Sequence, residues 1–313
     1  MLIVIGGPTG SGKSEVCCLL AKRIGGEIIS ADSMCVYRYM DVGTAKPLEC
    51  MEEVRHHLVN LVEPGEVFDA KVFEELALRA IEEIKGRRKV PIVCGGTYLY
   101  LQALLYGIEE TPPPDWSLRK RLYALAEKKG SAYLHQKLKV VDPQYAQKIS
   151  SKDTRRIVRA LEVFINSGRP FSSFHHWNSP RFEFVGFYLS WSWEELSKRI
   201  EERARRMLQR NLLEELERLM QMGFENFLTS PQAIGYKEFI PCIKGEKPLQ
   251  ECLTEMVKNT KEYAKRQIRW FRKQGWHEID IEKLGVKGAV EEVLDYIDAL
   301  SNIFSPCLKI IEG

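Results

Sequence analysis

A glycine-rich stretch near the amino terminus constrains the fold more than any other part of this chain. It reads Gly6-Gly7-Pro8-Thr9-Gly10-Ser11-Gly12-Lys13-Ser14 and fits the pattern GxxxxGKS. The apolar run Leu2 to Ile5 precedes it, and a helix-like segment, Glu15 to Ile24, follows it. A strand before such a loop and a helix after it are the context in which it binds phosphate. The chain is therefore predicted to begin as an α/β domain that binds a diphosphate or triphosphate.

The residue types in this loop suit a phosphate chain. Its backbone amides can turn inward around phosphate oxygens, and glycine allows the close approach. Lys13 would supply a point charge, and Ser14 a hydroxyl for a bound Mg2+. The residues expected to bind diphosphate are Gly7, Pro8, Thr9, Gly10, Ser11, Gly12, Lys13 and Ser14. A glycine-rich turn without a ligand is the alternative, but it does not account for the flanking strand and helix.

Composition points to a soluble, globular, cytoplasmic protein. With 313 residues, 44% of them hydrophobic, the chain has ample material for a core. Its apolar runs are strand-sized, whereas a membrane span needs about 20 apolar residues. The first run is also too short for the core of a signal peptide. The eight cysteines show neither a CxxC pair nor zinc-ligand spacing, so most are expected to be reduced and buried.

Positive charge is concentrated in segments, although the net charge of +3 is small. Residues 255–273 hold seven basic residues against two acidic ones. Five of the basic residues recur at steps of three and four, which gathers them on one helix face. Such a face is usually a solvated surface. Two further basic segments, 152–159 and 198–210, favour a polyanionic partner instead.

Strand-like runs alternate with helical patterns in the first third of the chain, as in a parallel α/β sheet. The expected strands are 2–5, 27–31, 56–62, 90–94, 181–191 and 278–280. The expected helices are 15–24, 68–85, 98–105, 115–129, 132–140, 144–149, 153–166, a helix or helix pair at 192–222, 249–274 and 289–304.

A proline run, Thr111-Pro112-Pro113-Pro114, is the clearest break in this order. Three prolines cannot continue a helix, and they form a stiff connector. The segment that follows is helical in pattern and lacks strand-like runs. The prediction is a core domain formed by 1–112 and 182–313 with a helical insertion domain at 113–181, which could act as a lid or grip a large substrate.

Two polar residues are expected at the ligand-binding edge of the sheet. Asp32 follows one expected strand, and Thr97 follows the Gly95-Gly96 pair at the end of another. Ligands of parallel α/β sheets bind beyond the carboxyl ends of the strands. An aspartate in a turn and a threonine that caps a helix remain alternatives for these positions.

Seven segments together resemble the tRNA dimethylallyltransferase family, whose members are also called tRNA isopentenyltransferases. They are GPTGSGKS at 7–14, ADSMCVYRYMDVGTAKP at 31–47, HHLVNLVEPGEVFDA at 56–70, PIVCGGTYLYLQAL at 91–104, DTRRIVRALEV at 153–163, AIGYKE at 233–238 and YAKRQIRWFRK at 263–273. They keep their order and span nearly the whole chain, which a shared phosphate loop alone would not produce.

The resemblance implies a reaction. The dimethylallyl group of dimethylallyl diphosphate would pass to the exocyclic amine of the adenosine just 3′ of the tRNA anticodon, with release of diphosphate. That adenine would be flipped into a channel from the end opposite to the donor. Asp32 matches the family's base, Thr97 a threonine near the acceptor nucleotide, and Arg203 an arginine on the diphosphate. A solvated helix arginine is the alternative for Arg203.

The resemblance also implies tRNA as the macromolecular partner, with the insertion gripping the anticodon stem-loop. Contacts to tRNA are expected from Asp32, Ser33, Met34, Cys35, Thr97, Arg119, Arg155, Arg156, Arg159, Gln232, Gly235, Tyr236 and Lys237. Mg2+ on Ser14 is the expected cofactor. Neither a membrane nor an obligate protein partner is expected, and the chain is expected to act as a monomer.

Two positions depart from the family pattern. Cys35 stands where the family usually has a glutamine that can pair with the adenine edge, and a thiol is a weak hydrogen-bonding partner. Tyr98 stands where the family usually has glycine. Its ring would pack in the core or, less favourably, against the prenyl group.

Three other functions compete with this one. An adenylate isopentenyltransferase acting on free AMP or ATP shares the loop and the aspartate, but needs no basic surface for an anticodon. A P-loop small-molecule kinase or nucleotide-driven switch would need only the loop, and no apolar strand here ends in paired acids for metal and water. A non-catalytic RNA-binding protein would not need Lys13 and Ser14 in place.

Overall fold

The computed structural model describes residues 1–174 and 179–311, with side chains up to residue 300. It divides into two compact units, Met1–Leu105 with Phe182–Gly313, and Tyr106–Arg181. The expected border at residue 113 lies inside the second unit. There the Arg159 guanidinium donates to the Thr111 hydroxyl at 2.8 Å and to the Pro112 carbonyl at 3.0 Å, which ties the proline run to this unit.

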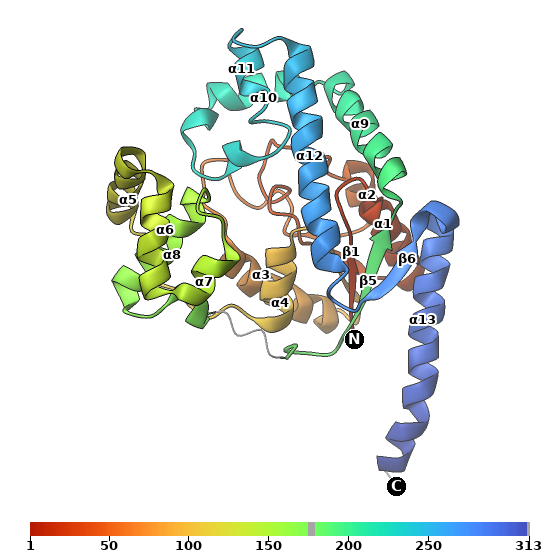
Figure 1. The fold of residues 1–313 in the computed structure, drawn as a ribbon. Coiled ribbons are helices and arrows are strands. Elements are labelled where there is room, and N and C mark those ends of the chain that lie inside the picture. The colour runs from red at the N-terminus through yellow and green to blue at the C-terminus, as the bar shows by residue number, and fades with distance from the viewer. Residues whose placement is uncertain (175–178, 312–313) are drawn as a thin grey trace. The chain divides into compact units, whose positions relative to one another are not determined.

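Six parallel strands form the sheet of the first unit, in the order β3-β2-β4-β1-β5-β6 (Figure 1). They are β1 (Leu2–Gly6), β2 (Glu27–Ser30), β3 (His56–His57), β4 (Pro91–Gly95), β5 (Phe184–Ser190) and β6 (His277–Asp280). The central strand β1 is buried along its whole length, and its Ile5 lies in register with Cys94 and Phe187. The expected parallel α/β fold is confirmed.

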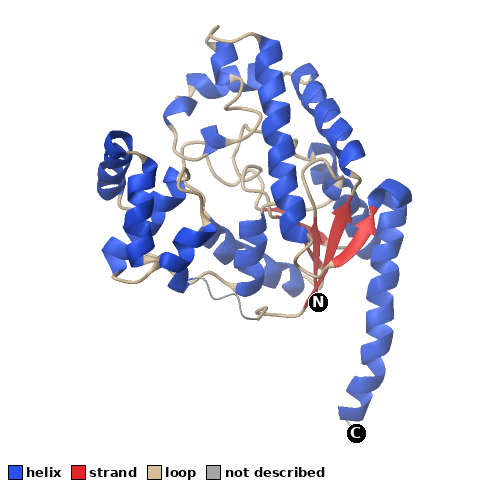
Figure 2. Ribbon diagram, viewed as in Figure 1, coloured by secondary structure: helices blue, strands red, loops and turns tan. Residues whose placement is uncertain are grey.

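The α-helices described in the first unit are α1 (Lys13–Ile24), α2 (Leu48–Glu53), α3 (Ala70–Gly86), α4 (Tyr98–Tyr106), α9 (Trp193–Gln209), α10 (Leu212–Gln221), α11 (Ile240–Ile243), α12 (Leu249–Phe271) and α13 (Ile281–Ile311). Of these helices, α1, α3 and α13 pack against this sheet, and α10 and α11 lie away from it (Figures 1 and 2). The expected segment 192–222 is a pair of helices, because Asn211 between them has φ 66°, a left-handed conformation that ends α9.

The core of the first unit lies between the sheet and α1 and α13. Ile5 and Phe187 of the sheet pack with Leu20 of α1 and Val290 of α13, and each of these four side chains is fully buried. Burial of side chains of this size stabilises the fold by about 1.5–3 kcal/mol each. Helix α1 is therefore anchored by its apolar face. This anchoring fixes the position of the phosphate loop, which lies at the amino end of the helix.

A disulfide joins Cys18 of α1 to Cys50 of α2. Closing a loop with a sequence separation of 32 stabilises a protein by about 3–4 kcal/mol in the chain-entropy estimate. Nothing in the cysteine spacing indicated this pair. The other cysteines with described side chains are free thiols, as expected for most, and Cys307 lies outside the residues whose side chains are described.

The described part of the second unit contains four α-helices, α5 (Trp116–Lys129), α6 (Ser131–Val141), α7 (Pro143–Lys148) and α8 (Thr154–Ser167), and the short 3-10 helix η1 (Phe171–Phe174). Leu134 and Leu138 of α6 pack with Ile157 of α8 in its core. No strand occurs among the residues of this unit that the structure describes. The chain enters and leaves it at one place, since the Arg181 guanidinium lies against Gly107, where any Cβ would overlap it.

None of the helices in the described part of the chain combines the length and the apolar character that crossing a bilayer requires.

Candidate active site

Two pockets open at the carboxyl end of the sheet in the first unit. The first is lined by residues that include Lys13, Ser14, Cys17, Cys35, His56, Cys94 and Gln267. The second is lined by residues that include Ser33, Met34, Gln232, Ala233, Lys237 and Arg266. Both are lined by Thr9, Asp32, Thr44, Arg203 and Tyr263. The two pockets therefore meet, and Asp32 lies where they meet.

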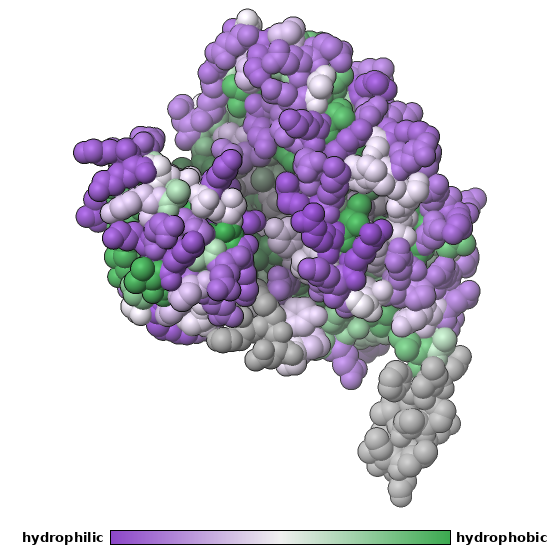
Figure 3. All heavy atoms as spheres, in the orientation of Figure 1, coloured by the Kyte–Doolittle hydropathy of each residue, from purple (hydrophilic) through white to green (hydrophobic). Residues whose placement is uncertain are grey.

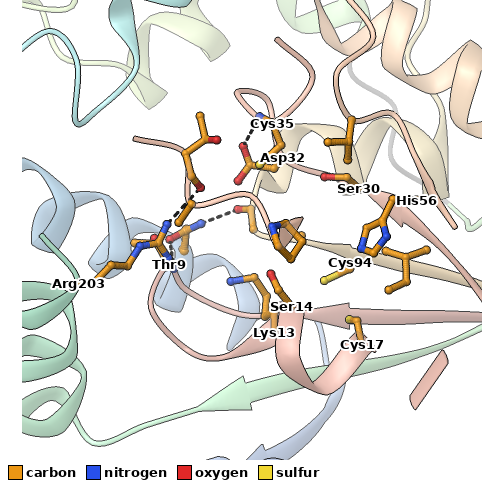
Figure 4. A pocket seen from close by; sticks show the side chains of 18 of the residues that line it. Thr9, Lys13, Ser14, Cys17, Ser30, Asp32, Cys35, His56, Cys94 and Arg203 are labelled. Carbon is orange, nitrogen blue, oxygen red and sulfur yellow. Dashed lines mark hydrogen bonds between the residues drawn. The ribbon is translucent and has the colours of Figure 1, made fainter. Parts of the chain in front are cut away.

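The phosphate loop, residues 7–14, turns through left-handed glycines. Gly10 has φ 82° and Gly12 has φ 87°, values that residues with side chains rarely adopt. Helix α1 begins at Lys13, within the last two residues of the loop, so its positive dipole end faces the first pocket. Thr9, Lys13 and Ser14 of the loop line that pocket, as Figure 4 shows for Lys13 and Ser14.

Two residues from outside the loop hold its outer side. The Trp191 indole N–H donates to the Ser11 carbonyl at 3.0 Å, and Arg199 Nε donates to the Gly10 carbonyl at 3.0 Å. The Arg199 guanidinium also lies over the Trp191 ring, 4.3 Å from its centre. Because C=O and N–H point to opposite sides of a trans peptide, a carbonyl held outward turns the next amide inward. Trp191 was not expected to contribute from the sequence.

Lys13 turns back on its own loop in this structure. Its ammonium donates to the Pro8 carbonyl at 2.7 Å. The pKa of Lys13 is lowered to about 8, chiefly by burial; the nearby Arg203 charge contributes to the lowering, while Cys94 and Asp32 act in the opposite direction. A positive charge held in a desolvated pocket binds an anion strongly, since solvent does not compete with it.

Asp32 follows β2 and is held by its own chain. Its Oδ1 accepts hydrogen bonds from the Met34 amide at 2.8 Å and the Cys35 amide at 3.2 Å. These bonds make the Asp32 carboxylate the cap of a turn, which was the structural alternative to a chemical role for this residue. Both end on Oδ1, so Oδ2 takes no part in them and can face a substrate. The turn and a chemical role are thus compatible.

Thr97 supports the start of the same loop. Its amide donates to the Ala31 carbonyl at 3.2 Å, and its Oγ1 accepts from the Ser33 amide at 3.1 Å. The residues that line the two pockets, as far as the structure describes them, do not include Thr97. The Thr97 side chain is half-buried, and its hydroxyl is bound to Ser33, the residue that follows Asp32.

Arg203 projects from α9 into both pockets (Figure 4). Its guanidinium donates weakly to the Thr44 carbonyl at 3.4 Å. Burial lowers the pKa of Arg203 and the Asp32 carboxylate raises it, but a guanidinium keeps its charge in either case. Arg203 and Lys13 therefore bring two cations to the first pocket.

The 33–47 loop is held by a buried carboxylate far away in the sequence. Glu215 of α10 accepts from the amides of Asp41, Val42 and Gly43 at 2.9–3.1 Å. It also accepts from the Tyr236 hydroxyl at 2.6 Å. Hydrogen bonds to an ionised acceptor are the strong kind. Glu215 is a structural residue of the site that sequence reasoning missed, because a lone glutamate on an amphipathic helix gives no signal.

Tyr236 corrects one expectation about tRNA contacts. Its side chain is 0% exposed, its hydroxyl is bound to Glu215, and its ring leaves no room for a Cβ at Gly43. Burial raises the pKa of the Tyr236 phenol well above its usual range, with the Glu215 charge adding to the effect. Tyr236 thus supports the 33–47 loop and does not reach a surface.

The neighbours of Tyr236 divide between the surface and the interior. Gln232 and Lys237 are exposed and line the second pocket, together with Ser33 and Met34. Gly235 is buried, and its amide donates to the Glu238 carboxylate at 2.8 Å. The exposed members of the segment are the ones that can contact a ligand.

The two departures from the family pattern have different surroundings. Cys35 is 7% exposed and lines only the first pocket, and burial raises the pKa of its thiol well above its usual range. Tyr98 at the start of α4 packs against the Trp270 ring, with the ring centres 6.1 Å apart. Both rings are half-buried, so Tyr98 packs on another aromatic side chain without being enclosed in the core.

Helix α12 contributes a whole face to the site. Met256, Thr260, Tyr263 and Gln267 recur at steps of three and four and line the pockets. The opposite side carries exposed basic residues, among them Lys258 and Arg269, and hydrophilic side chains cover α12 in Figure 3. Sequence reasoning found the basic face and missed the polar one, because Tyr263 and Gln267 belong to no charge pattern.

Four arginines were expected to contact tRNA from the second unit, and they differ in their surroundings. Arg119 and Arg159 bind the fully buried Glu162 of α8, with the Arg119 Nε at 2.8 Å. Arg155 and Arg156 are exposed, and Arg156 forms an ion pair with Asp153. Arg119 and Arg159 therefore serve the fold of this unit, whereas Arg155 and Arg156 face solvent.

Metal ligands are sparse. The described residues contain no group of three or more His, Cys, Asp or Glu side chains that could hold a metal ion. The first pocket does bring the Ser14 hydroxyl and the Asp32 carboxylate together. Hard oxygen donors in small number suit a magnesium ion that keeps waters and binds phosphate oxygens.

A family model described as IPP transferase matches residues 35–274. The match begins after the phosphate loop, so it is independent of the loop motif. A curated relative named tRNA dimethylallyltransferase, from Aquifex aeolicus, is 65% identical over 293 residues, which are 94% of this chain and 96% of the relative.

Solved structures agree with the sequence comparisons. A tRNA delta(2)-isopentenylpyrophosphate transferase from Staphylococcus epidermidis has a TM-score of 0.69 at 34% identity, covering 95% of this chain and 99% of that one. A eukaryotic dimethylallyltransferase described as acting on tRNA has a TM-score of 0.77 at 31% identity, covering 95% of this chain and 79% of that one.

Proposed function

The chain belongs to the IPP transferase family, and we propose that it performs the family's prenyl transfer with the residues around Asp32. The protein is an enzyme, a transferase that modifies tRNA. It moves the dimethylallyl group of dimethylallyl diphosphate to the exocyclic amine of the adenosine 3′ of the anticodon. The observation that carries the proposal is the meeting of the two pockets at Asp32, one lined by the phosphate loop and the other by residues 232–237.

The donor binds in the first pocket. Loop amides, Lys13 and Arg203 hold its diphosphate, whose charge grows as the allylic carbon leaves, so the same groups stabilise the transition state. Because Lys13 contacts the Pro8 carbonyl in the free protein, it exchanges that bond for phosphate oxygens on binding. Mg2+ fits the oxygen donors here and would be held by the Ser14 hydroxyl. When bound, it neutralises charge on the diphosphate.

The acceptor adenine enters through the second pocket. Its amine is a poor nucleophile, because its lone pair is delocalised into the ring. Asp32 accepts a proton as the new N–C bond forms and the C–O bond of the donor breaks, with the electron pair leaving on diphosphate. Thr97 keeps Ser33, and so the adjoining Asp32, in place.

The tRNA contacts divide between the two units. In the first unit we assign Ser33, Met34, Gln232 and Lys237, which line the second pocket. In the second unit we assign the exposed Arg155 and Arg156, and we propose that the helical domain at 113–181 grips the anticodon stem-loop. A substrate of this kind is consistent with a monomer that works in the cytoplasm.

The test is transfer of label from radiolabelled dimethylallyl diphosphate, with magnesium, to unmodified tRNA whose anticodon is followed by adenosine. AMP and ATP are offered in parallel reactions. Label on tRNA alone is expected. Label on the free nucleotides would favour an adenylate isopentenyltransferase, and consumption of ATP without transfer would favour a kinase. The comparisons give no support to either alternative.

A further inference from the structure

Gln267 of α12 joins two segments that follow different strands. Its Oε1 accepts a hydrogen bond from the Thr9 amide at 2.9 Å, and its Nε2 donates to the Gly96 carbonyl at 2.9 Å. Thr9 belongs to the phosphate loop after β1, and Gly96 to the turn after β4 that leads into Thr97. Gln267 is 2% exposed; its bond to Gly96 is buried, and its bond to Thr9 is partly buried at the edge of the first pocket.

The two hydrogen bonds allow the side-chain amide of Gln267 only one orientation. An N–H needs an acceptor and a carbonyl needs a donor, so Oε1 must face Thr9 and Nε2 must face Gly96. Gly96 is required for the approach, because a Cβ at this position would overlap Nε2 of Gln267. A buried amide with both ends paired is a rigid spacer between two backbones.

Further hydrogen bonds connect Gly96 to the segment that contains Asp32, the proposed base. Beyond Gly96, the Thr97 hydroxyl accepts from the Ser33 amide at 3.1 Å, and Ser33 adjoins Asp32. Thr9 and Asp32 both lie where the two pockets meet. A continuous path of backbone and hydrogen bonds thus leads from the diphosphate side to the acceptor side, and Gln267 is its link from α12.

We propose that Gln267 is a positioning residue that fixes the spacing between the bound diphosphate and the acceptor amine. The inference rests on the proposed function and deepens it. Gln267 does not act on the reacting atoms itself. It acts through Thr9 and Gly96, and a shift of about 1 Å in such a spacing can cost about 100-fold in rate.

A purely structural role, in which Gln267 only anchors α12, would give a different result. The helix has other anchors, since Ala264 packs with Leu196 and Ile200 of α9, and Lys261 pairs with Glu201 at 2.6 Å. Loss of the two amide bonds therefore leaves α12 attached. Loss of these bonds instead changes the spacing between the loops, and a changed spacing is detected as a lower kcat.

The decisive variant is Gln267→Met, which keeps length, volume and helix propensity but makes neither hydrogen bond. We expect kcat to fall about 100-fold, with the KM for dimethylallyl diphosphate and the Kd for tRNA within about 3-fold of the wild type. Gln250→Met, on the exposed first turn of the same helix, is the matched control and should retain full activity.

A second measurement does not depend on the reaction. Hydrogen–deuterium exchange followed by mass spectrometry should show faster exchange in the peptide that contains Thr9 in Gln267→Met, and no change in Gln250→Met. This readout stands even when the wild type transfers no label, an outcome that would refute only the proposed function.

Either of two results overturns the inference. One is a kcat within about 3-fold of the wild type together with unchanged exchange at Thr9. The other is a loss of activity that matches the loss of folded protein. If Gln267→Met does not fold, Gln267→Asn carries the same test, because its shorter side chain keeps the amide but cannot reach both partners.

Discussion

The phosphate loop and the 33–47 loop face the same pockets, but their shapes have different origins. In the phosphate loop the left-handed positions are glycines, Gly10 and Gly12. In the 33–47 loop they are Tyr39 and Ala45, with φ values of 63° and 52°, which side chains make unfavourable. The first loop is thus shaped largely by its own sequence, whereas the second needs partners from elsewhere.

Two buried charged side chains hold the 33–47 loop, Lys46 from within the loop and Glu215 from outside it. Lys46, inside the 33–47 loop, donates to the Tyr37 carbonyl at 2.5 Å and binds Asp41 at 2.6 Å. Glu215 holds the Asp41 amide from 174 positions away in the sequence. A substitution of Glu215 can therefore alter the 33–47 loop without altering the phosphate loop. Substitutions at Asp32, Glu215 and Lys13 test this difference between the two loops.

The largest effect is expected at Asp32, where the two loops meet. Asp32→Asn keeps an oxygen that can accept the Met34 and Cys35 amides, but removes the base. We expect kcat to fall about 1,000-fold, with thermal unfolding unchanged. Asp32→Ala, which also removes the cap, should lose stability as well. Near-normal turnover by Asp32→Asn, measured by label transfer, would exclude Asp32 as the base.

A smaller effect is expected from Glu215→Gln. An amide at this buried position weakens the bonds to the loop amides, so the free energy of unfolding in urea should fall by about 2 kcal/mol. Transfer to tRNA, as kcat/KM, should fall about 5-fold if about half of that loss is felt in the transition state. Binding of inorganic diphosphate, measured by calorimetry, should not change.

Tyr236→Phe is the matched control for Glu215→Gln. It removes one hydrogen bond to Glu215 and keeps the ring against Gly43, so a loss of about 1 kcal/mol in unfolding free energy is expected. If either variant binds diphosphate more weakly, the two loops are not independent.

A pH-dependent effect is expected at Lys13, and it is absent at pH 7. Above its pKa of about 8 in the free protein, Lys13 loses the charge that attracts diphosphate. The affinity for diphosphate should therefore decrease by up to about 10-fold per pH unit above pH 8. Stability should change in the opposite sense, because the unfolded chain holds this proton up to its ordinary pKa of 10.5. Between these two values the unfolded state binds more protons, so folding becomes more favourable as pH rises.

The variant Lys13→Met distinguishes the titration of Lys13 from the titration of diphosphate, because only the second remains in the variant. Affinity measured by calorimetry between pH 7 and pH 10 should be lower in the variant and should lack the part of the pH dependence that belongs to the lysine. An unchanged pH dependence would show that another group titrates.

The contrast between the loops also explains what the sequence could predict. The phosphate loop, β1 and α1 were predicted because a local motif and its flanks specify them. The helices of the second unit were predicted within a residue or two, since amphipathic spacing is local as well. Asp32 and Thr97 were found through the edge rule for parallel sheets and through a family resemblance.

The rest of the site depends on contacts between distant segments. Glu215 and Trp191 lie outside the segments that resemble the family, and Gln267 lies in one of them without a role of its own. The function of all three appears only when a partner far along the chain is placed beside them. Tyr236 shows the reverse case. Its segment matched a functional motif, but the side chain is buried and supports a loop.

The meeting of Gly107 and Arg181 has a consequence for how such a chain could arise. A segment whose two ends lie together can be removed or exchanged without stretching what remains. The helical unit is therefore a domain inserted into the connection between β4 and β5, the two neighbours of β1 in the sheet. A short turn in place of this domain would reconnect the chain, and a different inserted domain could give the same phosphate loop another substrate.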